Sequence, residues 1–225
     1  MKKNAHEILL IDKPTGFSSF QVVRILKKWY EKVGHAGSLD PFASGLLVIL
    51  TGNQTKKFID LQAYDKEYVG EIMLGISTNT YDISGEVIKK SEKLPQEAFS
   101  LNNFNELAEQ YVGEIEQRPP SFSAVKQAGR KLYELARKGI ECTPSWRRVL
   151  VKSFSFNAFQ MPILKFTAVV GKGVYIRSLA NDFGTLLGCG AVLVSLRRLR
   201  IGEYSITEAK NFGDLLNTVS WGTGN

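Results

Sequence analysis

Residues 34–47 read GHAGSLDPFASGLL, the most unusual run of the sequence. Asp40 precedes Pro41, and because a proline pushes the residue before it toward extended conformations, Asp40 cannot easily sit inside a helix. We therefore expect a glycine-rich loop over Gly34–Pro41, followed by a buried strand over Gly45–Gly52. An acid on such a loop can project into a cleft. The alternative is an ordinary turn in which the aspartate bonds its own backbone.

The segments on either side of this loop indicate a mixed fold. The apolar patterns predict strands at Ile8–Ile11, Glu67–Leu74, Val149–Phe156, Leu164–Val170 and Ile201–Ile206, and helices that begin at Ser18 or Ser19, contain Phe104 and Leu107, and span Arg177–Leu187. These strands and helices do not alternate strictly, which favours an α+β fold over a doubly wound parallel sheet.

Length and composition exclude several classes of protein. The chain has 225 residues, of which 44% are hydrophobic and 23% charged, so it can bury a core of its own. The sequence has no apolar run long enough to cross a bilayer and no signal-peptide core, so we expect a cytoplasmic protein without a membrane partner. Two cysteines and two histidines, far apart, make a zinc site improbable, and we expect no metal, although carboxylate magnesium sites stay open.

The positive charge is concentrated in one segment. The chain carries 29 Lys and Arg against 22 Asp and Glu, a net charge of +7. Gln117–Lys152 alone holds nine of the basic residues and two of the acidic ones, which leaves 20 of each sign elsewhere. The aromatic residues Phe122, Tyr133 and Trp146 alternate with these cations. A solvated helix face would explain the charge, but cations interleaved with rings are what a nucleic-acid clamp requires.

The loop sequence resembles a known signature. Residues 34–47 are similar to the pattern G-H-x-G-[TS]-L-D-P-x-A-x-G-x-L of the bacterial TruB type of tRNA pseudouridine synthase, a family that isomerises uridine 55 in the TΨC arm of tRNA. Further blocks resemble the same family, in order: DKPTG at 12–16, KEY at 66–68, LGISTNTYDISG at 74–85, QRPP from 117, GVYIRSL at 173–179 and LRR at 196–198. Together they cover the chain from about Ile8 to Ser205.

The resemblance implies a fold and a domain organisation. It implies the pseudouridine synthase fold, with a mixed, mainly antiparallel sheet flanked by helices. A single catalytic domain would span residues 1–225, with a basic RNA-binding insert, or thumb, over about 117–152. Many relatives continue into a small PUA-type RNA-binding domain at the C-terminus, and we expect none in this chain.

The resemblance also implies three catalytic residues. Asp40 would act at the sugar as nucleophile or charge stabiliser. Arg177 would pair with Asp40 and keep its carboxylate ionised, since a guanidinium can bind a carboxylate bidentately. Tyr68 would place its ring on the flipped uracil, and its hydroxyl would help to remove the C5 proton. Without the motifs, Arg177 would be read as a surface helix cap and Tyr68 as a half-buried strand residue.

Other matched positions would contact the RNA. His35 would act as a base-flipping wedge or an RNA contact, although a lone loop histidine is more often structural. Lys56 would approach the RNA backbone. Tyr175 and Leu196 would line the pocket, although core packing explains these two nearly as well. The cations expected to grip phosphates within the insert are Lys126, Arg130, Lys131 and Arg137.

The expected reaction is an isomerisation, so we expect no cofactor. We expect tRNA as the partner, through its TΨC stem-loop, and a monomer with no obligatory protein partner. A tRNA-binding or RNA-folding factor without catalysis is the alternative from another class. A glycoside hydrolase using Asp40 and Asp82 is a weaker one.

Overall fold

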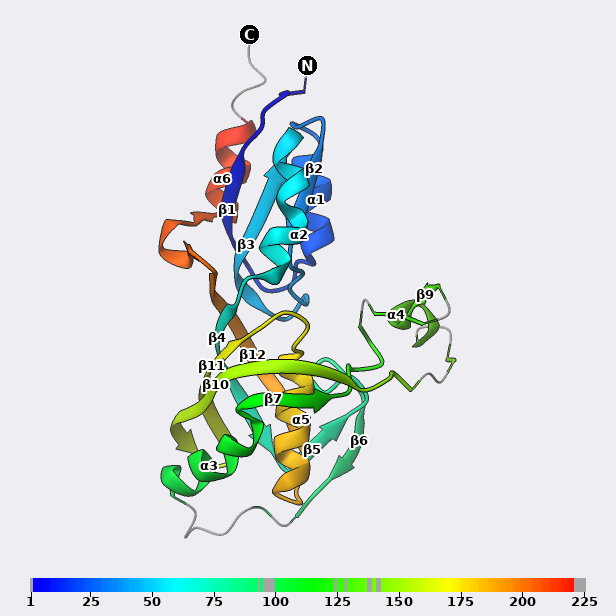
Figure 1. Ribbon diagram of the computed structural model, residues 1–225, viewed down its shortest axis with the longest axis vertical. Helices are drawn as coiled ribbons and strands as arrows, with labels where there is room; N and C mark the ends of the chain where they lie inside the picture. Colours follow the sequence, from blue (N-terminus) through cyan, green and yellow to red (C-terminus); the bar gives the residue numbers. More distant parts are fainter. Residues whose placement is uncertain are drawn as a thin grey trace. The chain divides into compact units, whose positions relative to one another are not determined.

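The computed structural model describes residues 2–92, 94, 100–123, 125–127, 129–136, 139–140 and 143–220, without the side chains of 126–127, 131 and 217–220. The chain divides into two compact units: unit 1 comprises Met1–Tyr68 and Leu196–Asn225, and unit 2 is Val69–Ser195. The sequence pattern gives no sign of this division. Figure 1 labels most of the helices and strands of both units. None of the described helices is long and apolar enough to cross a membrane.

Unit 1 is built on a sheet in which the strands follow the order β14-β1-β3-β12. β1 (Ile8–Lys13) is antiparallel to β3 (Ser44–Thr51), and β2 (Val33–Ala36) pairs antiparallel with β3 as well. β12 (Ala191–Ile201) runs parallel to β3, and β14 (Lys210–Asn211) runs parallel to β1. The loop that carries Asp40 therefore joins two paired strands.

The helices of unit 1 begin with α1 (Ser19–Leu26), which starts where the sequence predicts. Ser18 caps it: its hydroxyl accepts a hydrogen bond from the backbone N–H of Gln21, and the Gln21 side chain accepts one from the backbone N–H of Ser18. The remaining short elements are η1 (Gly52–Lys57), α2 (Phe58–Ala63), β13 (Tyr204–Ser205), η3 (Ile206–Glu208) and α6 (Phe212–Ser220).

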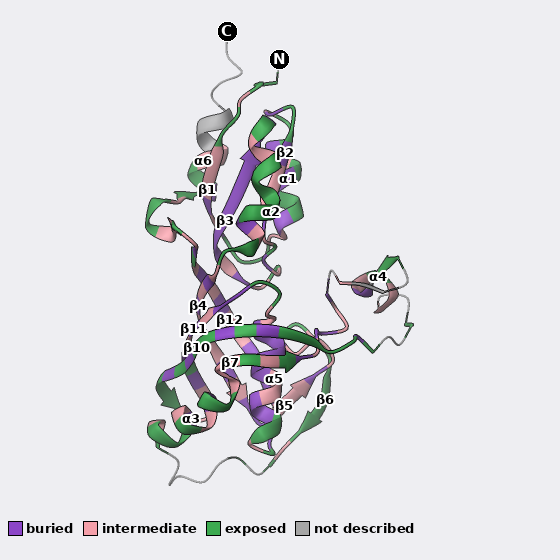
Figure 2. Cartoon of the chain, viewed as in Figure 1, coloured by how far each residue is buried: buried purple, intermediate pink, exposed green. Residues whose placement is uncertain are grey.

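β3 has apolar residues on both faces because both faces are covered. Leu47 and Ile49 pack in a core with the α1 residues Val22 and Leu26. Leu46, Val48 and Leu50 point the other way and pack with Leu61 of α2 and Ile201 of β12. Figure 2 shows β3 as an almost continuous buried ribbon. This double coverage explains why the strand reads as an unbroken apolar run instead of an alternating one.

Unit 2 contains a second set of strands, in the order β12-β4-β11-β10-β7, to which β12 contributes its N-terminal residues. The elements are β4 (Lys66–Leu74, of which Val69 onward lies in unit 2), α3 (Leu101–Ala108), η2 (Glu109–Tyr111), β7 (Gly113–Gln117), β10 (Arg147–Gln160), β11 (Ile163–Val170) and α5 (Ile176–Leu186). β10 is antiparallel to both β11 and β7. The core between helices and strands is aromatic, with Phe183 of α5 in contact with the rings of Phe104, Phe154 and Phe156.

Two smaller pieces complete unit 2. β5 (Ile76–Thr78) and β6 (Val87–Lys90) form an antiparallel hairpin. The insert between β7 and β10 contains the two-residue strands β8 (Lys126–Gln127) and β9 (Arg130–Lys131), which pair with each other, and the helix α4 (Leu132–Ala136).

The predicted fold class is confirmed, because most strand pairs are antiparallel and helices pack on the sheets. Two element predictions are wrong. The expected loop over Gly34–Pro41 begins as strand β2, which ends at Ala36. The eleven residues of β12 were not expected to form a strand, and the strand expected at Ile201–Ile206 is interrupted: Ile201 ends β12, and Tyr204–Ser205 form the separate short strand β13. Arg197 and Arg198 interrupt the apolar pattern of β12, and only the fold shows that Arg198 is buried.

Candidate active site

Asp40 lies on a loop in which the neighbours on both sides are fixed. The hydroxyl of Ser19, at the start of α1, donates to the Leu39 carbonyl at 3.2 Å and accepts from the Leu39 N–H at 2.8 Å. On the other side, the Pro41 carbonyl accepts a hydrogen bond from the Gly16 N–H at 2.7 Å. Asp40 itself is half-buried. The loop therefore holds a carboxylate in a defined place without burying it completely.

Lys13, at the end of β1, binds the same loop through the carbonyl of Ala43. Its side chain is fully buried, and its ammonium group donates to the carbonyls of Pro14 at 2.8 Å, Phe17 at 2.6 Å and Ala43 at 2.6 Å. Burial lowers the pKa of Lys13 to about 8; the negative charge of Asp40 opposes this shift, and the positive charge of Arg198 adds to it. Lys13 thus supplies three hydrogen bonds and a positive charge close to Asp40.

Arg198, on β12, is the second buried cation of the site. Its guanidinium donates to the carbonyls of Leu46 at 2.8 Å, Gly37 at 2.9 Å and Ser38 at 3.4 Å, and to the hydroxyl of Tyr68 at 3.4 Å. One side chain therefore binds both the loop of Asp40 and the hydroxyl of Tyr68. The predicted residues Asp40 and Tyr68 come together in unit 1 through this arginine.

Gly45 allows β3 to approach the strand that carries Arg198. Gly45 has a φ of +103°, and a Cβ at this position would lie 2.3 Å from the backbone oxygen of Arg198. Any other residue would separate the two strands. The glycine in the signature is thus explained by packing.

His35 lies on β2, in the same unit. Its Nδ1 is buried and has no hydrogen-bond partner among the described residues. Burial, followed by the charge of Arg198, lowers the pKa of His35 to about 4. The imidazole is therefore neutral at pH 7, and it does not provide a cation for RNA phosphates.

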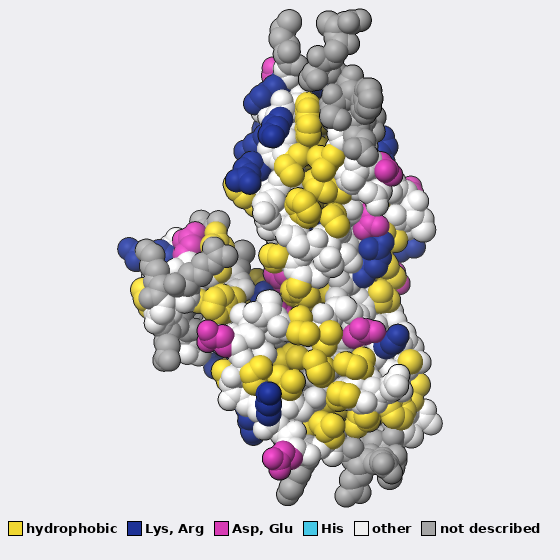
Figure 3. All heavy atoms as spheres, turned by 180° about the vertical axis from the view of Figure 1, so that it is seen from behind, with side chains coloured by type: hydrophobic (Ala, Val, Ile, Leu, Met, Phe, Trp, Pro, Cys, Tyr) yellow, Lys and Arg dark blue, Asp and Glu magenta, His cyan; other side chains and the backbone are white. Residues whose placement is uncertain are grey.

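Lys56 and Leu196 complete the predicted residues of unit 1. Lys56 is exposed on η1, and Leu196 is buried on β12 with 8% of its surface exposed. In Figure 3, Lys and Arg side chains gather along one edge of unit 1. The exposed cations of α1, η1 and the segment between α1 and β2 are Arg24, Lys27, Lys28, Lys32, Lys56 and Lys57.

Arg177 lies in the first turn of α5, in unit 2, and is buried with 4% of its surface exposed. Its guanidinium forms a salt bridge with Asp82 at 3.2 Å and donates to the carbonyls of Thr80 at 3.0 Å and Phe122 at 2.9 Å. Asp82 in turn accepts hydrogen bonds from the hydroxyl of Thr80 and from the backbone and hydroxyl of Ser84. The predicted pairing of Arg177 with Asp40 would join the two units and stays a prediction.

Tyr175 caps the start of α5 and is held by its backbone. Gln117, which is buried at the end of β7, accepts from the Tyr175 N–H at 2.8 Å and donates to its carbonyl at 3.1 Å. This contact fixes the base of the insert to the helix that carries Arg177. The start of the insert is therefore linked by hydrogen bonds to the helix that carries Arg177.

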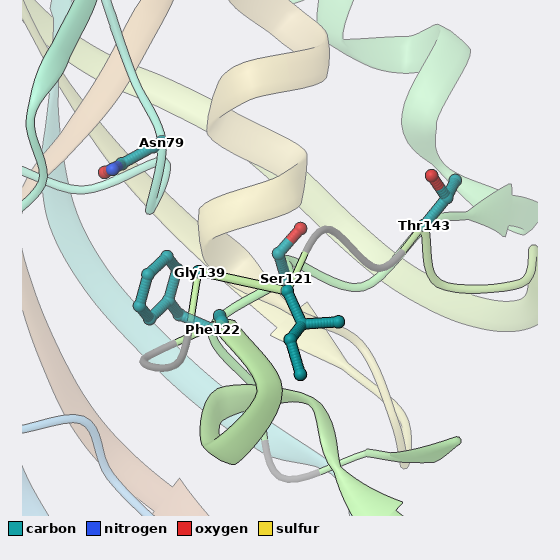
Figure 4. A pocket seen from close by; sticks show the side chains of 7 residues that line it. Asn79, Ser121, Phe122, Gly139 and Thr143 are labelled. Carbon is teal, nitrogen blue, oxygen red and sulfur yellow. The ribbon is translucent and has the colours of Figure 1, made fainter. Parts of the chain in front are cut away.

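The cations of the insert are only partly described. Arg130 is exposed on β9. The backbone of Lys126 and Lys131 forms a cross-strand pair, while their side chains, and the whole of Arg137, lie outside the described residues. A cavity of about 490 Å³ in unit 2 lies between the hairpin and the insert (Figure 4). Its lining residues are Asn79, Ser121, Phe122, Ala136, Gly139, Ile140 and Thr143.

Comparison with known proteins identifies the family. The family model described as "TruB family pseudouridylate synthase (N terminal domain)" matches residues 24–176, and that of the "tRNA pseudouridylate synthase B C-terminal domain" matches residues 177–223. The chain belongs to the TruB family. A TruB relative named tRNA pseudouridine synthase B from Chlamydia pneumoniae is 45% identical over 93% of this chain and 88% of its own length. Another, from Chloroherpeton thalassium, is 41% identical over 95% and 90%.

Solved structures agree on the TruB fold. A crystal structure of a Cbf5-Nop10-Gar1 complex contains a chain that is 28% identical, with a TM-score of 0.71. The match covers 96% of the present chain and 55% of that chain, so this protein spans about half the length of that structural relative. The partners named in that complex are those of the structural relative and not of this protein.

Sequence reasoning missed three buried residues: Lys13 and Arg198 in unit 1, which bind the loop of Asp40, and Asp82 in unit 2, which pairs with Arg177. Lys13 and Arg198 lie within blocks that match the family, but nothing in the sequence marks them as site residues. Asp82 entered only as a possible second carboxylate of a glycoside hydrolase. A buried cation leaves no periodic signal, because its partners are backbone carbonyls from distant segments. For Asp82, the run TYDIS offered a hint, since hydroxyl residues flank the acid within a turn.

Proposed function

We propose that this TruB protein converts uridine 55 in the TΨC loop of tRNA to pseudouridine, with Asp40 as the catalytic carboxylate. The observation that carries the proposal is the arrangement in unit 1, where one buried arginine binds both the loop of Asp40 and the hydroxyl of Tyr68. Isomerisation of uridine in tRNA is the activity of the family to which the chain belongs. The position in the tRNA and the role of Asp40 are our inference.

The reaction requires no net gain or loss of atoms. The bond between C1′ of the ribose and N1 of uracil breaks, the base turns, and a bond forms between C1′ and C5. C5 then loses its proton, and N1 ends with one. A carboxylate at the sugar can stabilise or bond to C1′ while the base is detached, and a group near C5 must accept the proton.

The described residues fit these roles. Asp40 is half-buried and therefore accessible, and the buried Lys13 places a positive charge near it, which opposes loss of its negative charge. Tyr68 is 9% exposed, and Arg198 donates to its hydroxyl oxygen. A tyrosine oxygen that accepts one hydrogen bond can still take up or give a proton when a uracil lies against the tyrosine ring. We assign proton removal at C5 to Tyr68, whose oxygen takes the C5 proton while its own hydroxyl proton passes to solvent, so that the tyrosine ends neutral as it began.

The target nucleotide must leave its stack to reach this site. We propose that the insert holds the tRNA by its phosphates, using the cations expected there, while the neutral His35 fills space beside the extruded base. Arg177 would hold Asp40 in place, in addition to its ion pair with Asp82. No cofactor is required by the balance of the reaction.

The test uses an unmodified tRNA transcript that carries tritium at C5 of uridine. The wild-type protein should release one equivalent of tritium, and mapping should place pseudouridine at position 55. Asp40→Asn should retain tRNA binding and lose turnover by at least about 10³-fold, as expected for removal of a group that acts in the transition state.

Asp65→Asn provides a matched control. Asp65 is also a half-buried loop aspartate of unit 1, just before β4, and its substitution should leave turnover within about twofold of wild type. Normal turnover by Asp40→Asn would refute the catalytic assignment. Tight tRNA binding by the wild-type protein without any tritium release would instead indicate an RNA-folding factor.

A further inference from the structure

Trp146 is an exposed aromatic residue held in a defined position at the base of the insert. It keeps 56% of its surface exposed and directly precedes β10. The guanidinium carbon of Arg118, which directly follows β7, lies 4.6 Å from the centroid of the Trp146 ring. Arg118 therefore covers part of the ring by a cation–π contact, while much of the remaining ring surface faces solvent.

The backbone beneath this pair is fixed. Arg147 pairs with Gln117 across the two strands, so the residues just beyond them, Trp146 and Arg118, face each other where the strands separate. The carbonyl of Arg118 accepts a hydrogen bond from the hydroxyl of Ser178 at 2.7 Å. Ser178 directly follows Arg177 on α5. The pair of Trp146 and Arg118, called the platform below, is thus attached to the first turn of α5, which also carries the proposed positioning residue Arg177.

The environment of Arg118 supports a ligand-binding role. Its Nε is buried and has no hydrogen-bond partner among the described residues. The exposed ring of Trp146 and the guanidinium of Arg118 thus lie together at one end of the insert.

A flat, electron-rich ring that is exposed and held in place is suited to stacking on another flat ring. Nucleobases present such faces, and stacking tolerates any base. The insert around this platform has a net charge of +7, which favours a polyanion over a neutral aromatic ligand. Because Arg118 already restrains the ring, less conformational freedom is lost when a base binds.

We propose that Trp146, backed by Arg118, is a stacking site for an unpaired nucleobase of the RNA substrate, separate from the site that receives the isomerised uracil. The proposal rests on the proposed function, since it takes the same tRNA as ligand. It adds a contact that depends on ring stacking and not on charge, and it predicts a contribution to RNA affinity rather than to the chemical step.

The test compares Trp146→Ala with Leu150→Ala in the full chain. Leu150 is an exposed apolar residue of β10, four positions after Trp146, with 40% of its surface exposed. Trp146→Ala should weaken the Kd for an unmodified tRNA transcript by about 10-fold, the effect of losing one base–aromatic stack. The loss should be equal at every salt concentration, because no charge is removed. Turnover at saturating tRNA should stay within about twofold of wild type, and Trp146→Tyr should restore most of the affinity. Leu150→Ala should resemble wild type.

Tryptophan fluorescence gives a direct readout. The chain has three tryptophans, so the variant Trp29→Phe/Trp221→Phe leaves only Trp146. Its emission should be quenched when the transcript is added, and Arg118→Met should reduce both quenching and affinity. Unchanged emission, or a Trp146→Ala variant that binds as wild type, would overturn the stacking site while wild-type tritium release still supports the proposed function. Absence of tritium release from wild-type protein would instead count against the function itself.

Discussion

Arg198 is a single side chain on which several parts of the site depend. It is 1% exposed and donates to three backbone carbonyls and to the hydroxyl of Tyr68. Carbonyls that lose a buried donor are left without a partner, which is costly in an interior that water does not reach. The rate of catalysis should therefore be sensitive to Arg198, although we propose that Arg198 positions the reacting groups and does not touch the reacting atoms itself.

Arg198→Met should lower the free energy of unfolding by about 3 kcal/mol, the scale of breaking a buried charged network. It should reduce kcat by at least about tenfold with little change in KM, because it displaces Asp40 and Tyr68 and not the RNA contacts. Urea denaturation and steady-state kinetics on tRNA measure the two effects. Arg200→Met is the control: Arg200 lies on the same strand but is exposed, with Glu67 at 3.5 Å, and should cost less than about 1 kcal/mol. A kcat equal to wild type for Arg198→Met would contradict the positioning role.

Lys13 makes activity and stability respond to pH in opposite directions. Its pKa is lowered from 10.5 to about 8, so raising the pH through 8 removes a proton from the folded protein that the unfolded chain keeps up to about 10.5. The folded state binds fewer protons in this window, and its stability contribution from Lys13 therefore increases with pH. The ammonium group, however, loses one of its three donated hydrogen bonds and the charge beside Asp40.

We expect kcat to fall as the pH rises through about 8, with no parallel loss of stability. Turnover at saturating tRNA between pH 6.5 and 9.5, with urea midpoints at the same pH values, measures both. Titration of ¹³C-labelled lysine by NMR locates the pKa of Lys13 independently. A kcat that is flat to pH 9.5 would show that the charge on Lys13 does not matter to catalysis.

At the scale of elements, α5 is joined to the turn after β5 by a buried ion pair. Arg177 and Asp82 have side chains that are 5% and 4% exposed, and Thr80 and Ser84 satisfy the remaining carboxylate oxygen. A buried pair adds little net stability, but the removal of one member leaves an uncompensated charge.

Asp82→Asn should therefore destabilise the protein by about 3–5 kcal/mol, while Arg177→Met/Asp82→Leu should recover part of that loss. Both variants should lack activity, since each removes or displaces the guanidinium that we expect to hold Asp40. Thermal or urea unfolding, together with tritium release, separates the two effects. If the double variant is no more stable than Asp82→Asn, the penalty does not come from an unpaired charge. Full activity in the double variant would remove Arg177 from the mechanism.

At the scale of the whole molecule, the net charge and the reacting groups belong to different segments. The insert carries +7, whereas the rest of the chain has equal numbers of acidic and basic residues. Affinity for tRNA should thus depend on salt mainly through the insert, because each phosphate contact releases counterions. The exposed cations of unit 1 around Lys56 are balanced in sum by acids elsewhere.

Arg130→Glu should weaken tRNA binding and reduce the slope of log K against log salt by about one, with kcat at saturating tRNA unchanged. Kd measurements between 50 and 200 mM salt, on the scale where such slopes are resolved, test this. Lys210→Glu reverses an exposed cation outside the insert, on β14, and should leave the slope as it is. Equal slopes for Arg130→Glu and wild type would remove Arg130 from the RNA interface.

The sequence alone determined the family and the fold class, and it predicted Asp40, Tyr68 and Arg177 as the catalytic groups. An Asp-Pro pair between glycines defines a loop, apolar runs define buried strands, and Ser18 with Gln21 marks a helix start, because these are local effects of backbone geometry and hydrogen bonding. Tertiary structure decided what the cations do. Lys13, Arg198 and Arg177 look alike in the sequence, yet each is buried with different partners from distant segments. The energy of a buried charge depends on those partners, which only the folded chain brings within hydrogen-bond distance.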